Sequence, residues 1–468
     1  MNFNSVEFLV FFPTVLLLYA LVFRHERRRD LLLLAASYFF YMSWNWRYAG
    51  LILFSTTVDY FLGRKMSETE VQARRKRLMI VSITLNLGLL GFFKYNNFFV
   101  DSTGGLLTAL GVNLPLDTLR HSFLLPVGIS FYTFQSLSYT IDLYRKHIDV
   151  EHSFIKFALF VSFFPQLVAG PIVRAADFLP QLRTTPNVDR ERVLSGMALI
   201  FRGLFKKVVF ADLLAGLGVD TVFASPSDYS SLTLLLALYG YSFQIYNDFS
   251  GYSDVAIGAA RIMGFDLPDN FRRPYHSQNV REFWTRWHIS LSSWLRDYLY
   301  IPLGGSRASA GRVRFNLAAT MVLGGLWHGA AWNFVLWGAW HGFLLMLVRS
   351  APKSYDGASP WAVFGRQFLC FHLVVVSWLL FRVHSIPLLT EFLGGLGAMT
   401  LSLELTWPYL LILAGAAGTH FTKKQWIDSA IATFTRTPIV IQAVVYAGLI
   451  CLLAGLSFGG PAFIYFQF

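Results

Sequence analysis

Two histidines lie in stretches that are otherwise apolar and aromatic, and a histidine in such surroundings is suited to proton transfer. The clearer case is His328, in the stretch LWHGAAWNFVLWGAWHG from Leu326 to Gly342. An ionisable residue inside a membrane segment is a functional candidate by default, because burying it is costly. A neutral imidazole can take a proton from a hydroxyl near pH 7. We therefore expect His328 to be a general base, with glycines beside it that let a backbone or a substrate approach closely.

The second histidine, His288, belongs to a segment that mixes aromatic and basic residues. As one helix over Arg281–Tyr300, this segment is too polar for a membrane span and too aromatic for a solvated loop. It predicts an amphipathic or re-entrant helix at the cytoplasmic interface. Its basic groups suit an anionic cytosolic donor, and simple anchoring to lipid headgroups stays open as the alternative. The candidate donor-binding residues are Arg286, Trp287, Arg296 and Trp327.

Other reactive side chains receive no chemical role. His341 lies 13 residues beyond His328, and in a continuous helix this spacing turns it to another face, so we expect it to be structural. Cys370 and Cys451 lie in apolar runs and are expected to be buried small hydrophobic residues without a disulfide. No metal site is expected.

The aromatic tail over 461–468 ends in FIYFQF, with Tyr465 as its only hydroxyl. Aromatic residues favour the membrane interface, so one expectation is a simple anchor. The other expectation is a chemical role for the Tyr465 hydroxyl.

The elements that position these residues have the composition of a membrane protein. Hydrophobic residues make up 55% of the 468 residues and charged residues 14%, with a mean hydropathy of +0.48. Soluble domains carry about 25% charged residues. A transmembrane helix needs about 20 mostly apolar residues, which leaves room for about ten or eleven spans. We expect an all-α polytopic membrane protein with a single domain over 1–468.

The catalytic centre is expected over 126–342, where the apolar runs contain many glycine, proline and polar residues. Interrupted helices occur in a bilayer only where protein or water surrounds them. Asp248 and Asp254 are therefore expected to face a polar interior. These features predict a ring of ordinary helices around a thin centre with re-entrant helices and an aqueous funnel. Two shorter runs, Leu31–Met42 and Tyr48–Leu62, are expected to form a hairpin.

The net charge of +12 does not indicate nucleic-acid binding, because the basic residues cluster in short loops between apolar runs. The positive-inside rule places these loops in the cytoplasm and the N-terminus, the loop His384–Thr406 and the C-terminus outside. The clusters are Arg24–Arg29, Arg74–Arg77, Arg202–Lys207, Arg307–Arg314 and Lys423–Lys424.

Five segments of the centre form a distinctive set: PVGISFYTFQSLSYTID, FPQLVAGPIVR, YNDFSGYSDVAIG, FWTRWHISLSSWLRDYLYIPLGG and GGLWHGAAWNFVLWG. In these segments the chain resembles the membrane-bound O-acyltransferase (MBOAT) family, and within it the bacterial branch that serves O-acetylation of alginate, cellulose or peptidoglycan. The resemblance implies that His328 matches the family's invariant histidine and His288 its second conserved histidine. It also implies acetyl-CoA as the donor, an extracytoplasmic partner protein, an exopolysaccharide as the final acceptor, and a place in the bacterial inner membrane. By its likeness to the family's D-alanyl transfer members, the chain is expected to use Tyr465 to accept the acyl group and pass it outward to a partner.

Other functions stay open at this point. A peptidoglycan, lipid or protein acyltransferase would use the same chemistry on another acceptor. A transporter or flippase would also carry intramembrane acids and broken helices. Transporters usually show two related halves, however, and none is visible in this sequence.

Overall fold

The computed structural model describes residues 1–112, 114–167, 170–350, 357–422 and 424–457, and this part of the chain is helical, without β-strands. The α-helices are α1 (Val6–Val22), α2 (Glu26–Asn45), α3 (Ala49–Ser67), α4 (Gln72–Leu90), α5 (Asn96–Ala109), α6 (Ile129–Tyr144), α7 (Phe154–Ser162), α8 (Phe164–Leu167), α9 (Ala175–Leu182), α10 (Arg190–Phe205), α11 (Asp220–Ala224), α12 (Ser231–Ile262), α13 (Val280–Arg286), α14 (Ile289–Leu295), α15 (Ala310–His328), α16 (Trp332–Leu347), α17 (Pro360–Arg382), α18 (Ile386–Gly397), α19 (Trp407–Phe421), α20 (Lys424–Thr435) and α21 (Ile439–Ser457).

Short 3₁₀ or π-helical segments join several of these helices. They are η1 (Trp46–Tyr48), η2 (Gly91–Tyr95), η3 (Leu116–Leu119), η4 (Lys206–Asp212), η5 (Ala215–Val219), η6 (Pro226–Asp228), η7 (Pro274–His276), η8 (Arg296–Tyr300) and η9 (Val348–Ser350).

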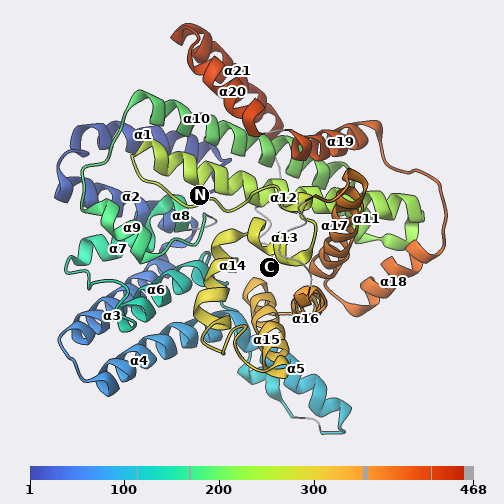
Figure 1. The fold of residues 1–468 in the computed structure, drawn as a ribbon, viewed down its shortest axis with the longest axis horizontal. Coiled ribbons are helices and arrows are strands. Elements are labelled where there is room, and N and C mark those ends of the chain that lie inside the picture. Colours follow the sequence, from blue (N-terminus) through green and yellow to red (C-terminus); the bar gives the residue numbers. More distant parts are fainter. Residues whose placement is uncertain (113, 168–169, 351–356, 423, 458–468) are drawn as a thin grey trace.

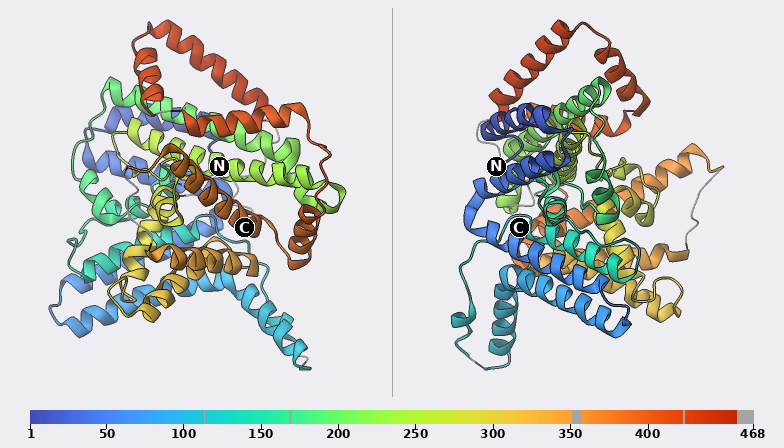
Figure 2. Two further views of the ribbon diagram at one scale, coloured as in Figure 1. Left: turned by 45° about the vertical axis from the view of Figure 1, so that its right-hand side comes forward. Right: turned by 90° about the vertical axis from the view of Figure 1, so that its left-hand side faces the viewer.

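Short helices occupy the middle of the molecule and longer helices surround them (Figure 1). The helices α13 and α14 lie near the centre, with α12 on one side and α15 and α16 on the other. Figure 2 shows that α5 and the pair α20–α21 project at opposite edges. This arrangement agrees with the predicted ring of long helices, whereas the thinness of the centre and its aqueous funnel stay predictions.

The outer helices carry apolar side chains on their exposed faces, as a surface in contact with lipid requires. On α1, Leu17 and Leu21 are exposed, and so is Trp361 at the start of α17. Within the described residues, two stretches are long and apolar enough to cross a membrane by length and composition alone, Gln72–Ala109 and Pro360–Arg382. The expected number of ten or eleven spans therefore stays a prediction.

Two long helices of the ring, α10 and α12, approach each other closely because glycines face glycines. A Cβ on Gly196 would lie 2.8 Å from the carbonyl oxygen of Gly258, and a Cβ on Gly258 would lie 2.5 Å from that of Gly196. One step along, Gly203 and Gly251 face each other in the same way. Small residues at such positions let helix backbones pack closely in a membrane, where van der Waals contact drives association.

The predicted intramembrane acids are buried between these same two elements, and their partners are cations. Asp254 binds Arg202 and Lys206, each at 2.7 Å. Asp248 lies 2.9 Å from Lys207, which also binds Asp212 at 2.8 Å. The expectation that Asp248 and Asp254 face a polar interior is correct, but neighbouring helices supply that polarity through ion pairs.

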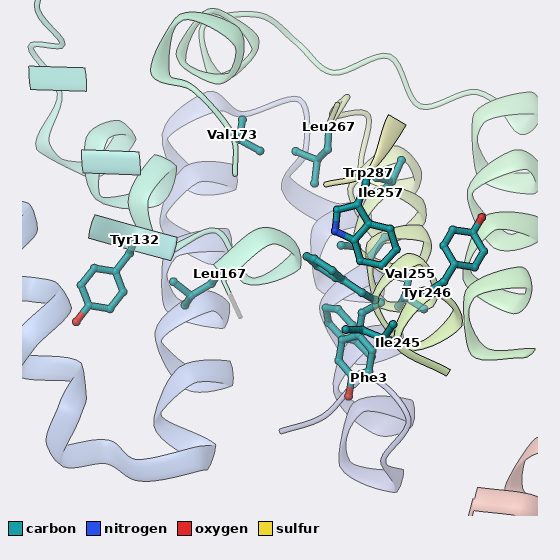
Figure 3. Close-up of a cluster of buried hydrophobic side chains, with 14 of the residues drawn as sticks. Phe3, Tyr132, Leu167, Val173, Ile245, Tyr246, Val255, Ile257, Leu267 and Trp287 are labelled. Carbon is teal, nitrogen blue, oxygen red and sulfur yellow. The ribbon is translucent and has the colours of Figure 1, made fainter. Parts of the chain in front are cut away.

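The core beneath these helices is aromatic. Figure 3 shows Trp287 beside Ile257 and Tyr246 of α12, and the Trp287 and Tyr246 ring centroids are 6.4 Å apart. Phe3, Tyr132 and the other side chains in this view are also buried.

Several local expectations need correction. The stretch within α12 expected to be interrupted is one continuous helix of 32 residues, because its polar side chains pair within the protein. The segments α2 and α3 are separate helices as expected, yet both pack against α7 as well as meeting each other. Cys370 is buried, whereas Cys451 is exposed on α21.

Candidate active site

His328 is the last residue of α15, at the turn that leads into α16. The two helices pack backbone to backbone, since a Cβ on Gly325 would overlap the carbonyl oxygen of Phe334 and one on Gly338 would overlap that of Met321. A Cβ on Gly329 would overlap the Phe334 ring. The glycines near His328 thus serve the approach of another part of the chain, one of the two uses expected of them.

The end of α15 is held from outside by Lys94 and Tyr95 of η2. The Lys94 ammonium donates to the carbonyl oxygens of Trp327 at 2.5 Å and His328 at 3.1 Å. The Tyr95 hydroxyl donates to the carbonyl of Leu326 at 2.8 Å. The last carbonyls of a helix have no partner within it, and a cation there also interacts favourably with the helix dipole. Lys94 and Tyr95 therefore fix the position of His328.

The sequence predicted one helix through His288, but the structure has two helices that meet there. The chain breaks between α13 and α14, and His288 has a left-handed backbone with φ of 42° and ψ of 56°. This conformation is uncommon for a residue with a side chain. The break turns the wholly buried imidazole inward.

The orientation of the His288 ring is set by Asn270, a residue that the sequence analysis did not identify. The Asn270 Oδ1 atom accepts from the Ser290 amide at 3.2 Å and hydroxyl at 2.9 Å, and it lies 3.2 Å from His288 Nδ1. The Asn270 amide nitrogen donates to Ser253 at 3.2 Å. Since Oδ1 only accepts, His288 Nδ1 carries the proton and Nε2 carries the lone pair. Within the described residues, Nε2 has no hydrogen-bond partner.

The two histidines converge on one buried spot. Their ring centroids are 6.4 Å apart, and Trp327 lies beside both, at 5.8 Å from His288 and 5.1 Å from His328. Trp337 and Phe381 close the far side of His328, at 5.0 and 5.3 Å. His328 is only 4% exposed. The pair thus sits in an aromatic pocket from which bulk water is excluded.

The predicted donor-binding residues take different positions. Trp327 joins the histidines, and Trp287 is buried in the aromatic core beside Trp378 at 4.7 Å. Arg286 pairs with Glu282 and Arg296 with Asp297, each at 2.6 Å. The ion-pair partners of the two arginines are these acidic residues and not the two histidines. Donor binding by any of the four predicted residues stays a prediction. Tyr465 lies outside the described residues.

Two cavities flank the α15–α16 pair at its opposite ends. The larger, about 530 Å³, borders the turn, where Ala330, Ala331 and Trp332 line it together with Lys94 and His384. The smaller, about 150 Å³, borders the other end, and its lining includes Trp284, Ser292, Arg296, Tyr300 and Leu345. His328 therefore lies on the helix pair whose two ends border the cavities, and His288 reaches it from the break between α13 and α14.

His341 is closer to this site than a continuous helix would allow. The chain reverses at Gly329–Ala331, so α16 returns alongside α15. Trp337 contacts the His328 ring at 5.0 Å and the His341 ring at 4.8 Å. The helical-wheel argument that set His341 apart was wrong because it assumed no break. Within the described residues, no three His, Cys, Asp or Glu side chains gather as a metal site.

Comparisons with known proteins identify the family. The profile of the membrane-bound O-acyltransferase family matches residues 117–351. The "probable alginate O-acetylase" of Pseudomonas aeruginosa is 45% identical over 396 residues, which cover 82% of this chain and 73% of the relative. The peptidoglycan O-acetyltransferase of Helicobacter pylori is 34% identical over 391 residues, 77% of this chain and 72% of the relative.

A more distant relative, the teichoic acid D-alanyltransferase of Bacillus subtilis, is 27% identical over 279 residues, 56% of this chain and 69% of the relative. The matched region contains the histidine pair and both helices that carry the flanking cavities. With a family profile over half of its length and a 45% identical relative along most of it, the chain belongs to the membrane-bound O-acyltransferase family and is an O-acyltransferase.

Proposed function

We propose that this enzyme takes an acetyl group from cytosolic acetyl-CoA and transfers it to a hydroxyl on the extracytoplasmic side, as a step in the O-acetylation of a polysaccharide. The observation that carries the proposal is the buried pair His288 and His328, with ring centroids 6.4 Å apart, at the helix pair α15–α16 whose opposite ends border two cavities.

In the proposed reaction, His328 takes the proton from the acceptor hydroxyl while its oxygen attacks the thioester carbonyl carbon. The new C–O bond forms a tetrahedral intermediate, the C–S bond then breaks, and the departing thiolate recovers the proton from the His328 imidazolium. General-base assistance of this kind contributes about 10²–10⁴-fold. The aromatic walls of the pocket keep water from hydrolysing the thioester.

His288 has a narrower role than the sequence alone allowed. The Nδ1–H group of His288 donates to Asn270, so the ring nitrogen left for the site is Nε2, which can only accept a hydrogen bond. An acceptor can bind the hydroxyl of the incoming alcohol but cannot donate to the thioester carbonyl. This supports a role in orienting the acceptor hydroxyl or relaying its proton.

The direction of transfer rests on the charge pattern. The smaller cavity is lined by Arg296 and Tyr300, which precede the basic cluster Arg307–Arg314 in the chain. The positive-inside rule assigns this cluster to the cytoplasm. The larger cavity includes His384, at the start of the loop assigned to the outside. We infer donor entry beside Arg296, acceptor entry beside Trp332, and a location in the bacterial inner membrane.

The acceptor is inferred from the relatives. The Pseudomonas aeruginosa relative is named for alginate and the Helicobacter pylori relative for peptidoglycan. We propose alginate or cellulose, completed by an extracytoplasmic partner protein, with peptidoglycan as the second choice. Tyr465 is proposed as an acyl relay on the same path. Mass spectrometry under turnover checks the relay, and an unmodified Tyr465 together with a fully active Tyr465→Phe variant would contradict it.

The test of the function uses the full-length protein in lipid nanodiscs, acetyl-CoA labelled in its acetyl group, and alginate or cello-oligosaccharide acceptors. Wild type should transfer the label and release free CoA thiol. His328→Ala should lose about 10²–10⁴-fold in kcat while remaining folded. His147→Ala, which changes an exposed histidine whose partner is Asp142, should stay at the wild-type rate. A folded His328→Ala protein with normal transfer would refute the assignment.

A further inference from the structure

Behind His328, on the side of the smaller cavity, three aromatic side chains hold buried ring nitrogens that lack partners. Within the described residues, the indole N–H groups of Trp284 and Trp337 and both ring nitrogens of His341 make no hydrogen bond. His341 is wholly buried and Trp337 nearly so. Leaving a buried polar group unsatisfied costs about 1–3 kcal/mol, so a cluster of them calls for an explanation.

The three rings are in mutual contact. His341 lies 5.0 Å from Trp284 and 4.8 Å from Trp337, and the two indoles are 5.7 Å apart. Phe283 stacks beside His341 at 6.1 Å and contributes no polar atom. The unsatisfied groups therefore form one cluster in apolar surroundings.

This cluster lies between the smaller cavity and the catalytic histidine. Trp284 lines the cavity together with Ser292, Arg296 and Tyr300. Trp337, at the other end, lies 5.0 Å from His328. Trp284 thus borders the smaller cavity and Trp337 borders His328, so the cluster spans the space between them.

The hydrogen-bonding capacity of the cluster matches a chain that contains secondary amides. An indole offers one donor and no acceptor, whereas a neutral imidazole offers one of each. The pantetheine arm of a thioester donor carries two secondary amides, each with one carbonyl acceptor and one N–H donor. Two indoles can donate to the two carbonyls, while His341 accepts from an amide N–H.

We propose that Trp284, Trp337 and His341 bind the amide groups of the donor's pantetheine arm and so place its thioester at His328. The proposal rests on the proposed function, because it requires a thioester donor that enters on this side. His341 is then a binding and positioning residue, and the three rings, which are in contact, separate to admit the arm.

The test compares donors that share the acetyl thioester and differ in their amides: acetyl-CoA and acetyl-pantetheine with two, S-acetyl-N-acetylcysteamine with one, and S-ethyl thioacetate with none. For His341→Ala we expect about a tenfold loss of kcat/KM with the two-amide donors, carried mainly by KM. With S-ethyl thioacetate the loss should be under about twofold. Trp284→Phe and Trp337→Phe, which remove an N–H and keep a ring, should show the same pattern.

The matched control is Trp340→Phe on the same helix, whose indole donates to the Leu373 carbonyl at 3.0 Å and lies outside the cluster. It should not discriminate among the donors. Equal losses with all donors, or no loss in any of the three variants, would overturn the inference, because trapped water or plain packing would then explain the cluster. An acetylated carrier protein shares the pantetheine arm without the nucleotide, so comparing it with acetyl-CoA shows which source the enzyme accepts.

A wild-type protein that transfers from no thioester would reject the proposed function and this inference with it. Losses that do not depend on the donor's amides reject the inference alone.

Discussion

At the scale of single residues, the site is built from strain and from hydrogen bonds that leave one atom free to react. His288 keeps a left-handed backbone that costs a residue with a side chain about 1–2 kcal/mol. Such outliers persist where the surrounding structure determines them, and they gather at functional sites. Here the strained residue is His288, whose ring centroid lies 6.4 Å from that of His328 and whose Nε2 has no hydrogen-bond partner among the described residues.

A comparison of two substitutions at His288 measures this strain. His288→Gly should unfold at a higher temperature than His288→Ala, by the equivalent of about 1 kcal/mol, because glycine tolerates a positive φ. Both should lose transfer activity. Thermal unfolding in detergent provides the measurement, and equal stability of the two variants would argue against backbone strain at this residue.

Asn270 acts through His288. Asn270→Ala removes the acceptor for Nδ1, so the ring can adopt the other tautomer, and kcat should fall on the order of tenfold or more with a small change in KM. Ser253→Ala removes only the partner of the Asn270 amide nitrogen and should have a smaller effect. Steady-state kinetics on both variants decide this, and an unchanged kcat in Asn270→Ala would remove Asn270 from the mechanism.

At the scale of elements, the helix pair α15–α16 presents His328 and the π-helical segment η2 holds its end. Lys94→Met keeps the length of the side chain but removes the donor to the carbonyls of Trp327 and His328. We expect kcat to fall about tenfold, because small misplacement of a catalytic group is costly. Tyr95→Phe, which loses one hydrogen bond to Leu326, should show a smaller decrease.

The close contact of α10 and α12 should tolerate no added atoms. Gly203→Ala would place a methyl group against the Gly251 carbonyl and 2.8 Å from Val255, so we expect destabilisation of about 1–3 kcal/mol. Gly88→Ala on α4 is the control, since a Cβ there meets nothing within 4 Å. Thermal unfolding of both variants measures the difference, and similar melting temperatures would contradict the packing.

At the scale of the whole molecule, the proposed function requires two entrances on opposite sides of the membrane. In a Cys451→Ser background, Ser102→Cys in the larger cavity should react with an impermeant maleimide from outside. Tyr300→Cys in the smaller cavity should react only from the cytoplasmic side. Labelling of right-side-out and inverted vesicles distinguishes the two, and the reverse pattern would overturn the topology.

The sequence motifs were enough to predict the family, and the comparisons confirm it. His288 and His328 were singled out because ionisable rings are rare among apolar residues; the structure places their rings 6.4 Å apart, and their chemical roles stay predictions. Asn270 and Lys94 were missed, because their hydrogen bonds reach partners 18 and 233 residues away. No local pattern marks such contacts. The prediction of one helix across His288 was wrong, because tertiary packing holds His288 in a left-handed backbone conformation that local helix propensity does not favour.

The amino-acid sequence by itself determined that the protein is suited to a membrane environment and which residue types can accept or donate a proton. Composition sets how much apolar surface must avoid water, and side-chain type sets acid–base capacity. Only the tertiary structure decided that the rings of His288 and His328 meet and that His341 lies against Trp337, the same indole that contacts His328. Their meeting depends on two reversals of the chain, at His288 and at Gly329–Ala331, and each is stabilised by contacts with segments distant in the sequence.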